Sequence, residues 1–207
     1  MSKTEYLRLS TIALVIGLTV LVAVPSPASA QLSLLGGGTT SSTGTSATAV
    51  AVTVLGSTTM LASTGNLANA TDALGAELDS ASGDMGSAAV LHATAIGSGD
   101  SVASEASLGD LVLSIAGTQI TATSAYATAL ADSTAGTSGW SSVDGLAVNG
   151  TSLVSTGEAN QTINLGAITL VLNEVTQTAS GITVNALHIT SLDGTVDVVV
   201  ASATAGQ

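Results

Sequence analysis

Apolar and polar positions alternate along most of the chain, and the pattern is clearest near its end. From Gly181 to Ala203 the sequence reads GITVNALHITSLDGTVDVVVASA, two apolar-rich runs separated by Asp193-Gly194. Aspartate and glycine tolerate the positive φ that tight hairpin turns need, so this stretch predicts a β-hairpin. The second run is too uniformly apolar for a half-exposed strand. It indicates a strand that is buried on both faces or packed against another sheet.

The chain from Met85 onward also has the pattern of strands joined by turns. TQITATSAYATALA, which starts at Thr118, alternates small and polar residues as a strand with two different faces does. Turn signals recur at spacings of roughly ten residues, which is typical of β-sandwiches. The pattern therefore predicts an all-β fold, an antiparallel β-sandwich of about 10–12 short strands.

Residues 66–79 depart from this pattern. Apolar residues recur there at three- and four-residue spacing, with acidic residues between them: Leu67, Ala70, Leu74 and Leu78. This spacing predicts one short helix near residues 66–79, although Gly75 interrupts it. A long acidic loop is the equal alternative.

The N-terminal segment, residues 1–30, has the pattern of a secretory signal peptide. A basic region precedes an apolar core, and a small-residue cleavage site follows. Residues 31–47 are rich in Gly, Ser and Thr and predict a flexible leader, or one whose first apolar residues dock. A single β-sandwich domain is expected over residues 48–207. We therefore expect a secreted, extracellular or cell-surface protein.

Charge narrows the set of partners. Lys3 and Arg8 are the only basic residues besides histidine, and both belong to the predicted signal peptide. The rest of the chain is a polyanion, because 14 acidic residues occur in all and only Glu5 precedes residue 31. Such a surface cannot neutralise phosphate, which disfavours nucleic acid, and it disfavours a membrane after signal cleavage. With no Cys, no Phe and one Trp, the core must be aliphatic and free of disulfides.

The two histidines occur in similar units. LHAT, which contains His92, and LHIT, which contains His188, are each followed by a turn, an aspartate and a strand ending in Ala-Ser. A metal or catalytic role would need them close to a carboxylate or hydroxyl. The repetition favours a structural role instead, one position used twice and hydrogen-bonded near a strand end. We predict no catalytic residues, and a secreted hydrolase using either histidine is the least favoured alternative.

Two other candidate sites are a binding site for Ca²⁺ and an aromatic platform for a glycan. Asp193 and Asp197 flank the closing turn, where oxygen ligands suit Ca²⁺. No EF-hand loop or glycine-rich calcium repeat is present, so solvated turn carboxylates and no cofactor are the favoured interpretation. Trp140 and Tyr126 are the candidates for a platform that binds glycan, and Trp140 is equally suited to fill a gap in the core.

The chain from about Thr48 to Ala205 resembles the choice-of-anchor P family of bacterial exported surface proteins. The similar stretches are ASLGDLVLSIAGTQITATSAYATA, SSVDGLAVNG, TINLGAITLVLNEVTQ and GITVNALHITSLDGTVDVVVASATAG, with LNE and VNALH the most specific. The resemblance implies an exported protein with no defined catalytic residues and with an anchoring signal that varies between members. No sorting motif or apolar tail precedes Gln207, so we expect an anchor-less short form that is released or held by a partner.

These observations predict a non-enzymatic secreted or cell-surface structural or adhesion module. Proteins or glycans of the cell envelope or the extracellular space are the expected partners. A Ca²⁺-stabilised adhesive domain is one alternative. A self-assembling surface polymer subunit is another, because weakly charged apolar strands can pair through an open sheet edge.

Overall fold

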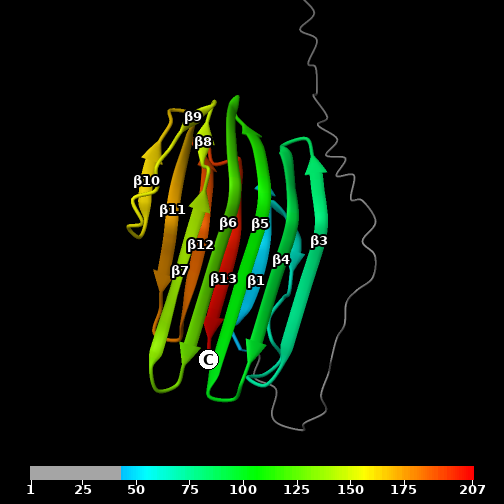
Figure 1. Cartoon of the computed structure of the whole chain (residues 1–207), viewed down its shortest axis with the longest axis vertical. Coiled ribbons are helices and arrows are strands. Elements are labelled where there is room, and N and C mark those ends of the chain that lie inside the picture. The colour runs from blue at the N-terminus through cyan, green and yellow to red at the C-terminus, as the bar shows by residue number, and fades with distance from the viewer. Residues whose placement is uncertain (1–42) are drawn as a thin grey trace, which may run out of the picture.

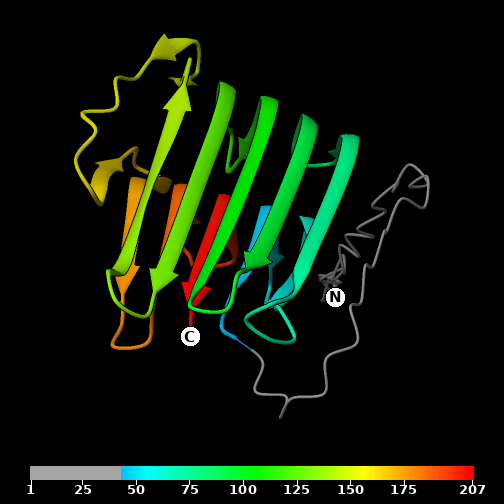
Figure 2. The same ribbon diagram turned by 60° about the horizontal axis from the view of Figure 1, so that its bottom comes forward.

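The computed structural model describes residues 43–207, so the predicted signal peptide and most of the predicted leader lie outside the described residues. Within that range the chain forms thirteen β-strands and no helix. The predicted fold class is confirmed: two antiparallel sheets pack face to face as a β-sandwich (Figures 1 and 2). The strand number slightly exceeds the expected one because two strands are only two residues long.

Sheet A has six strands in the order β10-β11-β12-β13-β1-β2. The C-terminal strand β13 therefore lies beside the first strand, β1, in the interior of the sheet. The bounds are Ser46–Val54 for β1, Ser57–Ser63 for β2, Gln161–Asn164 for β10, Ile168–Gln177 for β11, Gly181–Ser191 for β12 and Val196–Gly206 for β13.

Sheet B has seven strands, with β3-β4-β5-β6 as its continuous part. β7 pairs with one half of β6 and the short β8 with the other half, and β9 follows β8. The bounds are Ala73–Gly83 for β3, Gly86–Gly97 for β4, Ser101–Ile115 for β5, Thr118–Asp132 for β6, Gly136–Asp144 for β7, Ala147–Val148 for β8 and Thr151–Ser152 for β9.

The core between the sheets is aliphatic, as the composition requires. β13 packs on β5 and β6, and β12 packs on β6 and β7. The largest fully buried side chains are leucine, isoleucine and valine: Leu67, Leu91, Leu111, Ile115, Ile120, Ile168, Leu170, Leu172, Leu187, Ile189, Val102 and Val184. The predicted closing hairpin is β12–β13. β13 is packed against the other sheet on one face and only half-buried on its outer face.

The prediction of a helix or a long loop over residues 66–79 is wrong from Ala73 onward, because β3 begins there and pairs with β4. Leu74, Ala76 and Leu78 point toward the core with a period of two. Leu74 and Leu78 are four residues apart, a spacing that fits a strand face as well as a helix face. Pairing with β4, which local periodicity cannot report, decides between them.

A row of irregular positions crosses sheet A, and we call it the bulge row. The strand registers place five residues side by side at this level: Asn173, Ala186, Ala201, Ala49 and Ala62. Asn173, Ala201 and Ala62 have φ values of 56°, 49° and 47°. Positive φ interrupts the alternation of a strand, so two consecutive residues such as Val200 and Ala201 both face the core.

Sheet B carries a similar irregularity in β4 and β5. Val90 and Asp110 have φ values of 50° and 46°, and the β4–β5 register shifts between Ser87 and His92. We include these two residues in the bulge row. The same change of phase appears in β6, where the inward positions end at Ala122 and resume at Ala125.

The first strand starts slightly before the expected domain boundary. β1 begins at Ser46, whereas the leader was expected to run to residue 47. Thr45 is already buried, and its hydroxyl donates to the carbonyl oxygen of Gly206 at 3.1 Å. The two ends of the described chain are therefore tied together.

Candidate functional site

The two aromatic side chains of the described chain lie next to each other on the outer face of sheet B. Tyr126 comes from β6 and Trp140 from β7, and the register pairs Trp140 with Thr128, two residues from Tyr126. The ring centroids are 4.9 Å apart and the rings are tilted by 38°. Trp140 remains 57% exposed. Its alternative role as a core-filling residue is therefore wrong.

Polar groups surround the aromatic pair. The Tyr126 hydroxyl donates to Oε2 of Glu105 at 3.0 Å. Partial burial, followed by the hydrogen bond and the negative charge of Glu105, raises the pKa of Tyr126, so the phenol stays a donor. Glu105 lies between Thr94 and Thr128 in the neighbouring strands. An apolar ring beside carboxylate and hydroxyl groups can stack on the C–H face of a sugar and bind its hydroxyls.

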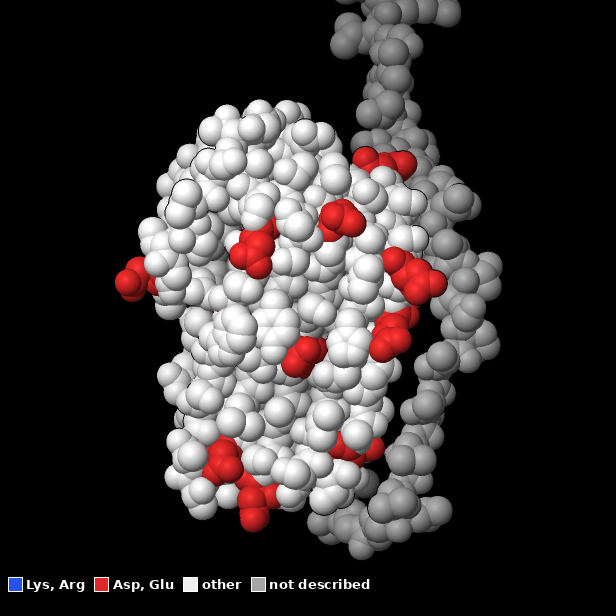
Figure 3. Space-filling view, viewed as in Figure 1, with Lys and Arg blue, Asp and Glu red and all other residues white. Residues whose placement is uncertain are grey.

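His92 lies on the same outer face, farther toward the β3 edge. Its Nε2 is 3.5 Å from Oε1 of Glu77, whose side chain is 77% exposed. The strand registers align Glu77, His92, Ser107 and Tyr126 in one row across β3, β4, β5 and β6. Figure 3 shows acidic side chains scattered over this face and no basic ones. The face is therefore polar and acidic around one aromatic patch.

His188 lies on the outer face of the other sheet. Its Nδ1 is 3.0 Å from both carboxylate oxygens of Glu174, and its Nε2 is 2.8 Å from Oδ2 of Asp197. Asn185 supports the cluster, because its side-chain amide donates to Glu174 at 2.6 Å. Burial alone would lower the pKa of His188, but the hydrogen bonds to Asp197 and Glu174 outweigh it and the pKa is raised. With a carboxylate at each nitrogen, the imidazolium is a structural cross-link between β11, β12 and β13.

The repeated histidine units occupy equivalent positions in the two sheets. His92 and His188 each follow a fully buried leucine, Leu91 and Leu187, which in turn follows a bulge-row residue. The two histidines point outward from opposite sheets, so they share no cleft. Both lie within strands, which corrects the expectation of a position near a strand end.

The two candidate calcium ligands serve separate purposes. Oδ1 of Asp193 accepts hydrogen bonds from the hydroxyls of Ser191 and Thr195, at 2.6 and 2.8 Å, and from the Thr195 amide at 3.0 Å. These hydrogen bonds lower the pKa of Asp193, and the bond from Ser191 has the largest effect. They also hold the β12–β13 turn. Asp197 bonds to His188 instead. Across residues 43–207 no group of three or more His, Cys, Asp or Glu side chains is arranged to hold a metal ion.

Sequence reasoning missed Glu174 and Asn185, although a signal for them was present. Both belong to the LNE and VNALH stretches that carry the family resemblance. The β11–β12 register places Glu174 opposite Asn185, and His188 lies three residues beyond Asn185 in the same strand. The Asn of LNE is Asn173, which belongs to the bulge row. The two stretches therefore meet at one place.

Comparison of the chain with protein-family models, with curated proteins and with solved structures gives no match. Among the described residues, no helix is long and apolar enough to cross a membrane.

Proposed function

We propose that this protein is a non-enzymatic secreted or cell-surface adhesion module, and that the outer face of sheet B binds an extracellular glycan. The observation that carries the proposal is the placement of Tyr126 and Trp140. Large aromatic side chains are usually drawn into a core, where they stabilise it most. Here aliphatic residues fill the core, and the aromatic pair lies outside it with Trp140 largely exposed.

The polar groups around the pair support a sugar as the ligand. The carboxylate of Glu105 already accepts a hydrogen bond from Tyr126. A carboxylate has several lone pairs, so Glu105 can accept further hydrogen bonds from the hydroxyls of a sugar. Threonine side chains on both neighbouring strands add hydroxyl groups. An anionic ligand is disfavoured because the face carries acidic side chains and no Lys or Arg.

A structural role, without catalysis, is supported by the surroundings of the titratable groups. His188 faces carboxylates at both ring nitrogens, so neither nitrogen is open to a substrate. His92 lies on the opposite sheet and pairs with an exposed glutamate. A general base needs a reacting group within hydrogen-bond reach, and the two histidines point outward from opposite sheets and share no cleft.

The extracellular setting rests on the sequence. The signal-peptide pattern of residues 1–30 and the resemblance to choice-of-anchor P proteins both support export. The same proposal accounts for retention at a surface, because the glycan-binding face would attach the protein to a glycan there.

The test uses Trp140 as a natural probe, since it is the single tryptophan of the chain. Its fluorescence is followed while the secreted protein is titrated with neutral soluble oligosaccharides and with cell-wall fragments. We expect a saturable change for at least one sugar class, and Tyr126→Phe should weaken the binding by removing the hydroxyl that orders Glu105.

Binding of the protein to the insoluble form of the same polysaccharide gives a second readout. Trp140→Ala should reduce the affinity by about 30-fold, the effect typical of a stacked aromatic anchor. Ser138→Ala, a change on the same strand and face, is the matched control and should bind normally. If Trp140→Ala and the unchanged protein bind every glycan tested equally, the proposal is wrong.

A further inference from the structure

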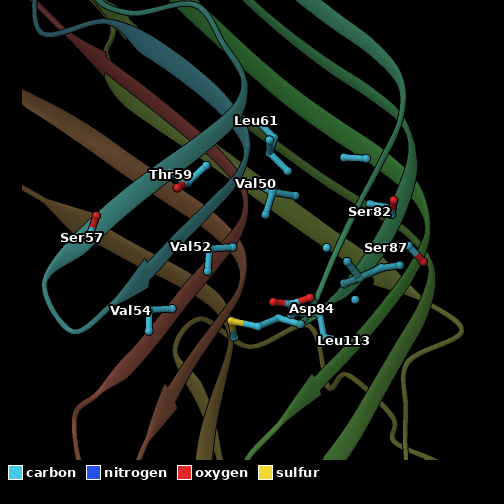
Figure 4. A pocket seen from close by; sticks show the side chains of 16 residues that line it. Val50, Val52, Val54, Ser57, Thr59, Leu61, Ser82, Asp84, Ser87 and Leu113 are labelled. Carbon is cyan, nitrogen blue, oxygen red and sulfur yellow. The ribbon is translucent and has the colours of Figure 1, made fainter. Parts of the chain in front are cut away.

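An apolar cleft opens between the sheets at the edge formed by β2 and β3. One wall is the inner face of β1 and β2, and the other is the β3–β4 hairpin with β5 (Figure 4). The main apolar lining residues are Val50, Val52, Val54, Leu61, Leu111 and Leu113. The cavity volume is about 100 Å³, well below the roughly 300–1,000 Å³ of small-molecule pockets. It is the right size for one or two aliphatic side chains.

Among residues 43–207, no strand pairs with the sheet edges beside this cleft. β2 is the last strand of sheet A and β3 the last strand of sheet B. An edge strand presents free backbone N–H and C=O groups, which can take up one more strand. Val52 and Met85 line the cleft and are only partly buried, so an added strand would complete both the hydrogen bonds and the apolar packing.

We propose that residues Leu32–Leu35 of this same chain fill the cleft as an added strand beside β3. The segment reads Leu-Ser-Leu-Leu and contains the only large apolar side chains between the predicted signal peptide and Thr43. In an extended strand Leu32 and Leu34 point to one face, because side chains alternate. The segment carries no charge, so burying it next to Asp84 brings no repulsion.

The chain length fits this placement. Leu34 precedes Thr43 by nine residues and Val52 follows it by nine, and each stretch spans about 30 Å when extended. β1 and β3 both run toward the cleft, since the lining includes the last residues of each. A segment returning from the cleft to Thr43 therefore runs antiparallel to β3, which matches the pairing throughout sheet B.

The same chain is a better source of the strand than a second copy. A short glycine-rich tether, here the residues that include Gly36-Gly37-Gly38, gives an effective concentration in the range of about 1 mM. A second copy would have to be present at that concentration to compete. The inference is independent of glycan binding, because the cleft lies between the sheets and the aromatic pair lies on the outer face.

The first test measures methionine oxidation by hydrogen peroxide in the full secreted chain. Met85 lines the cleft, whereas Met60 lies on β2 with 60% exposure and serves as an internal control. In Leu32→Ser/Leu34→Ser, the Met85 oxidation rate should rise to within about twofold of the Met60 rate, because oxidation follows exposure. Leu35→Ser, at a position pointing the other way, is the matched control and should leave Met85 protected.

The second test uses the absence of native cysteines. Leu34→Cys combined with Val52→Cys should form a disulfide within one chain under mild oxidation, whereas Leu34→Cys with Leu130→Cys, on the outer face of sheet B, should not. The proposal is overturned by either of two results. One is an unchanged Met85 oxidation rate in the double serine variant. The other is a disulfide of the Leu34→Cys/Val52→Cys variant that forms only between chains, which would assign the strand to a second copy.

Discussion

Replacing Val90 with asparagine tests whether backbone strain at the bulge row limits the stability of the protein. Valine is normally preferred over asparagine in a strand, yet we expect this substitution to raise the free energy of unfolding. Val90 has a φ of 50° and is 71% exposed. Left-handed backbone costs an L-residue roughly 1–2 kcal/mol, and a β-branched residue is especially poorly suited to it. Asparagine adopts this conformation far more readily and already occupies the bulge row at Asn173.

The magnitude for Val90→Asn follows from two opposing terms. Relief of strain contributes about 1–1.5 kcal/mol. Loss of the small buried part of the valine side chain costs about 0.5 kcal/mol, because less than a third of the residue is buried and a full valine is worth about 1.5–2 kcal/mol. The free energy of unfolding should therefore rise by about 0.5–1 kcal/mol, and the Tm by roughly 2–3 °C for a domain of this size.

The assay is equilibrium unfolding in urea, in which a change of stability moves the midpoint and leaves the slope unchanged. Val112→Asn is the matched control. Val112 lies in the neighbouring strand β5, is 38% exposed and lacks a positive φ. Asparagine is unfavourable at such a position, so the control should lose about 1 kcal/mol. If Val90→Asn lowers the midpoint as Val112→Asn does, backbone strain at the bulge row is not what limits stability there.

Three further predictions concern the other sheet. The folded-state pKa of His188 lies above its unfolded value of about 6.5, so its stabilising contribution is complete below that pH and is lost as the pH rises through the folded-state pKa. The urea midpoint should accordingly fall as the pH rises above about 6.5, and His188→Gln should remove most of this pH dependence and cost about 1.5–3 kcal/mol at pH 6. Thermal unfolding with and without EDTA should give the same midpoint, because Asp193 and Asp197 are bonded to different partners; a lower midpoint in EDTA would restore the Ca²⁺-stabilised alternative. Leu187→Ala, at a side chain with no exposure, should cost about 2–5 kcal/mol in urea unfolding, whereas Leu192→Ala, at 79% exposure, should stay within about 0.5 kcal/mol of the unchanged protein.

Local patterns were sufficient to predict the closing hairpin. Asp193-Gly194 carries the turn through side-chain bonds to Ser191 and Thr195 and a Gly194 φ of 70°, all of which depend on residues close in sequence. Alternation over the second half of β6 was equally readable, because alanines face the core at every second position from Ala125 to Ala131. These features need no information about distant strands.

Residues 66–79 and the bulge row could not be predicted in the same way. Whether Leu74 and Leu78 belong to a helix or a strand depends on pairing with β4. The spacing of apolar residues within 66–79 carries no information about that pairing. The bulge row is a property of five strands of sheet A and two of sheet B, aligned by their registers. In the sequence it appears only as scattered alanines, one asparagine, Val90 and Asp110, which have no common local signature.

The bulge row also separates the two kinds of candidate site. After a bulge the alternation restarts, so in β12 Ala186 and Leu187 are both buried and the next residue, His188, points outward. In β4 the residue before the leucine, Val90, is exposed and not buried, but Leu91 again lies inside and His92 outside. The repeated Leu-His pair is therefore accounted for by sheet geometry, without a requirement for chemistry at the histidines.

No comparable geometric rule places Tyr126 and Trp140. Apart from Leu130, the other outward positions of β6 and β7 are small or polar residues such as Thr128 and Ser138, which satisfy the fold. Trp140 is 57% exposed, so more than half of its surface adds nothing to the stability of the fold. The exposed surface of Trp140, next to the other aromatic ring of the described chain, is where the proposed ligand would stack. That contrast is why the proposed glycan-binding face is placed on sheet B and not at the histidine cluster of sheet A.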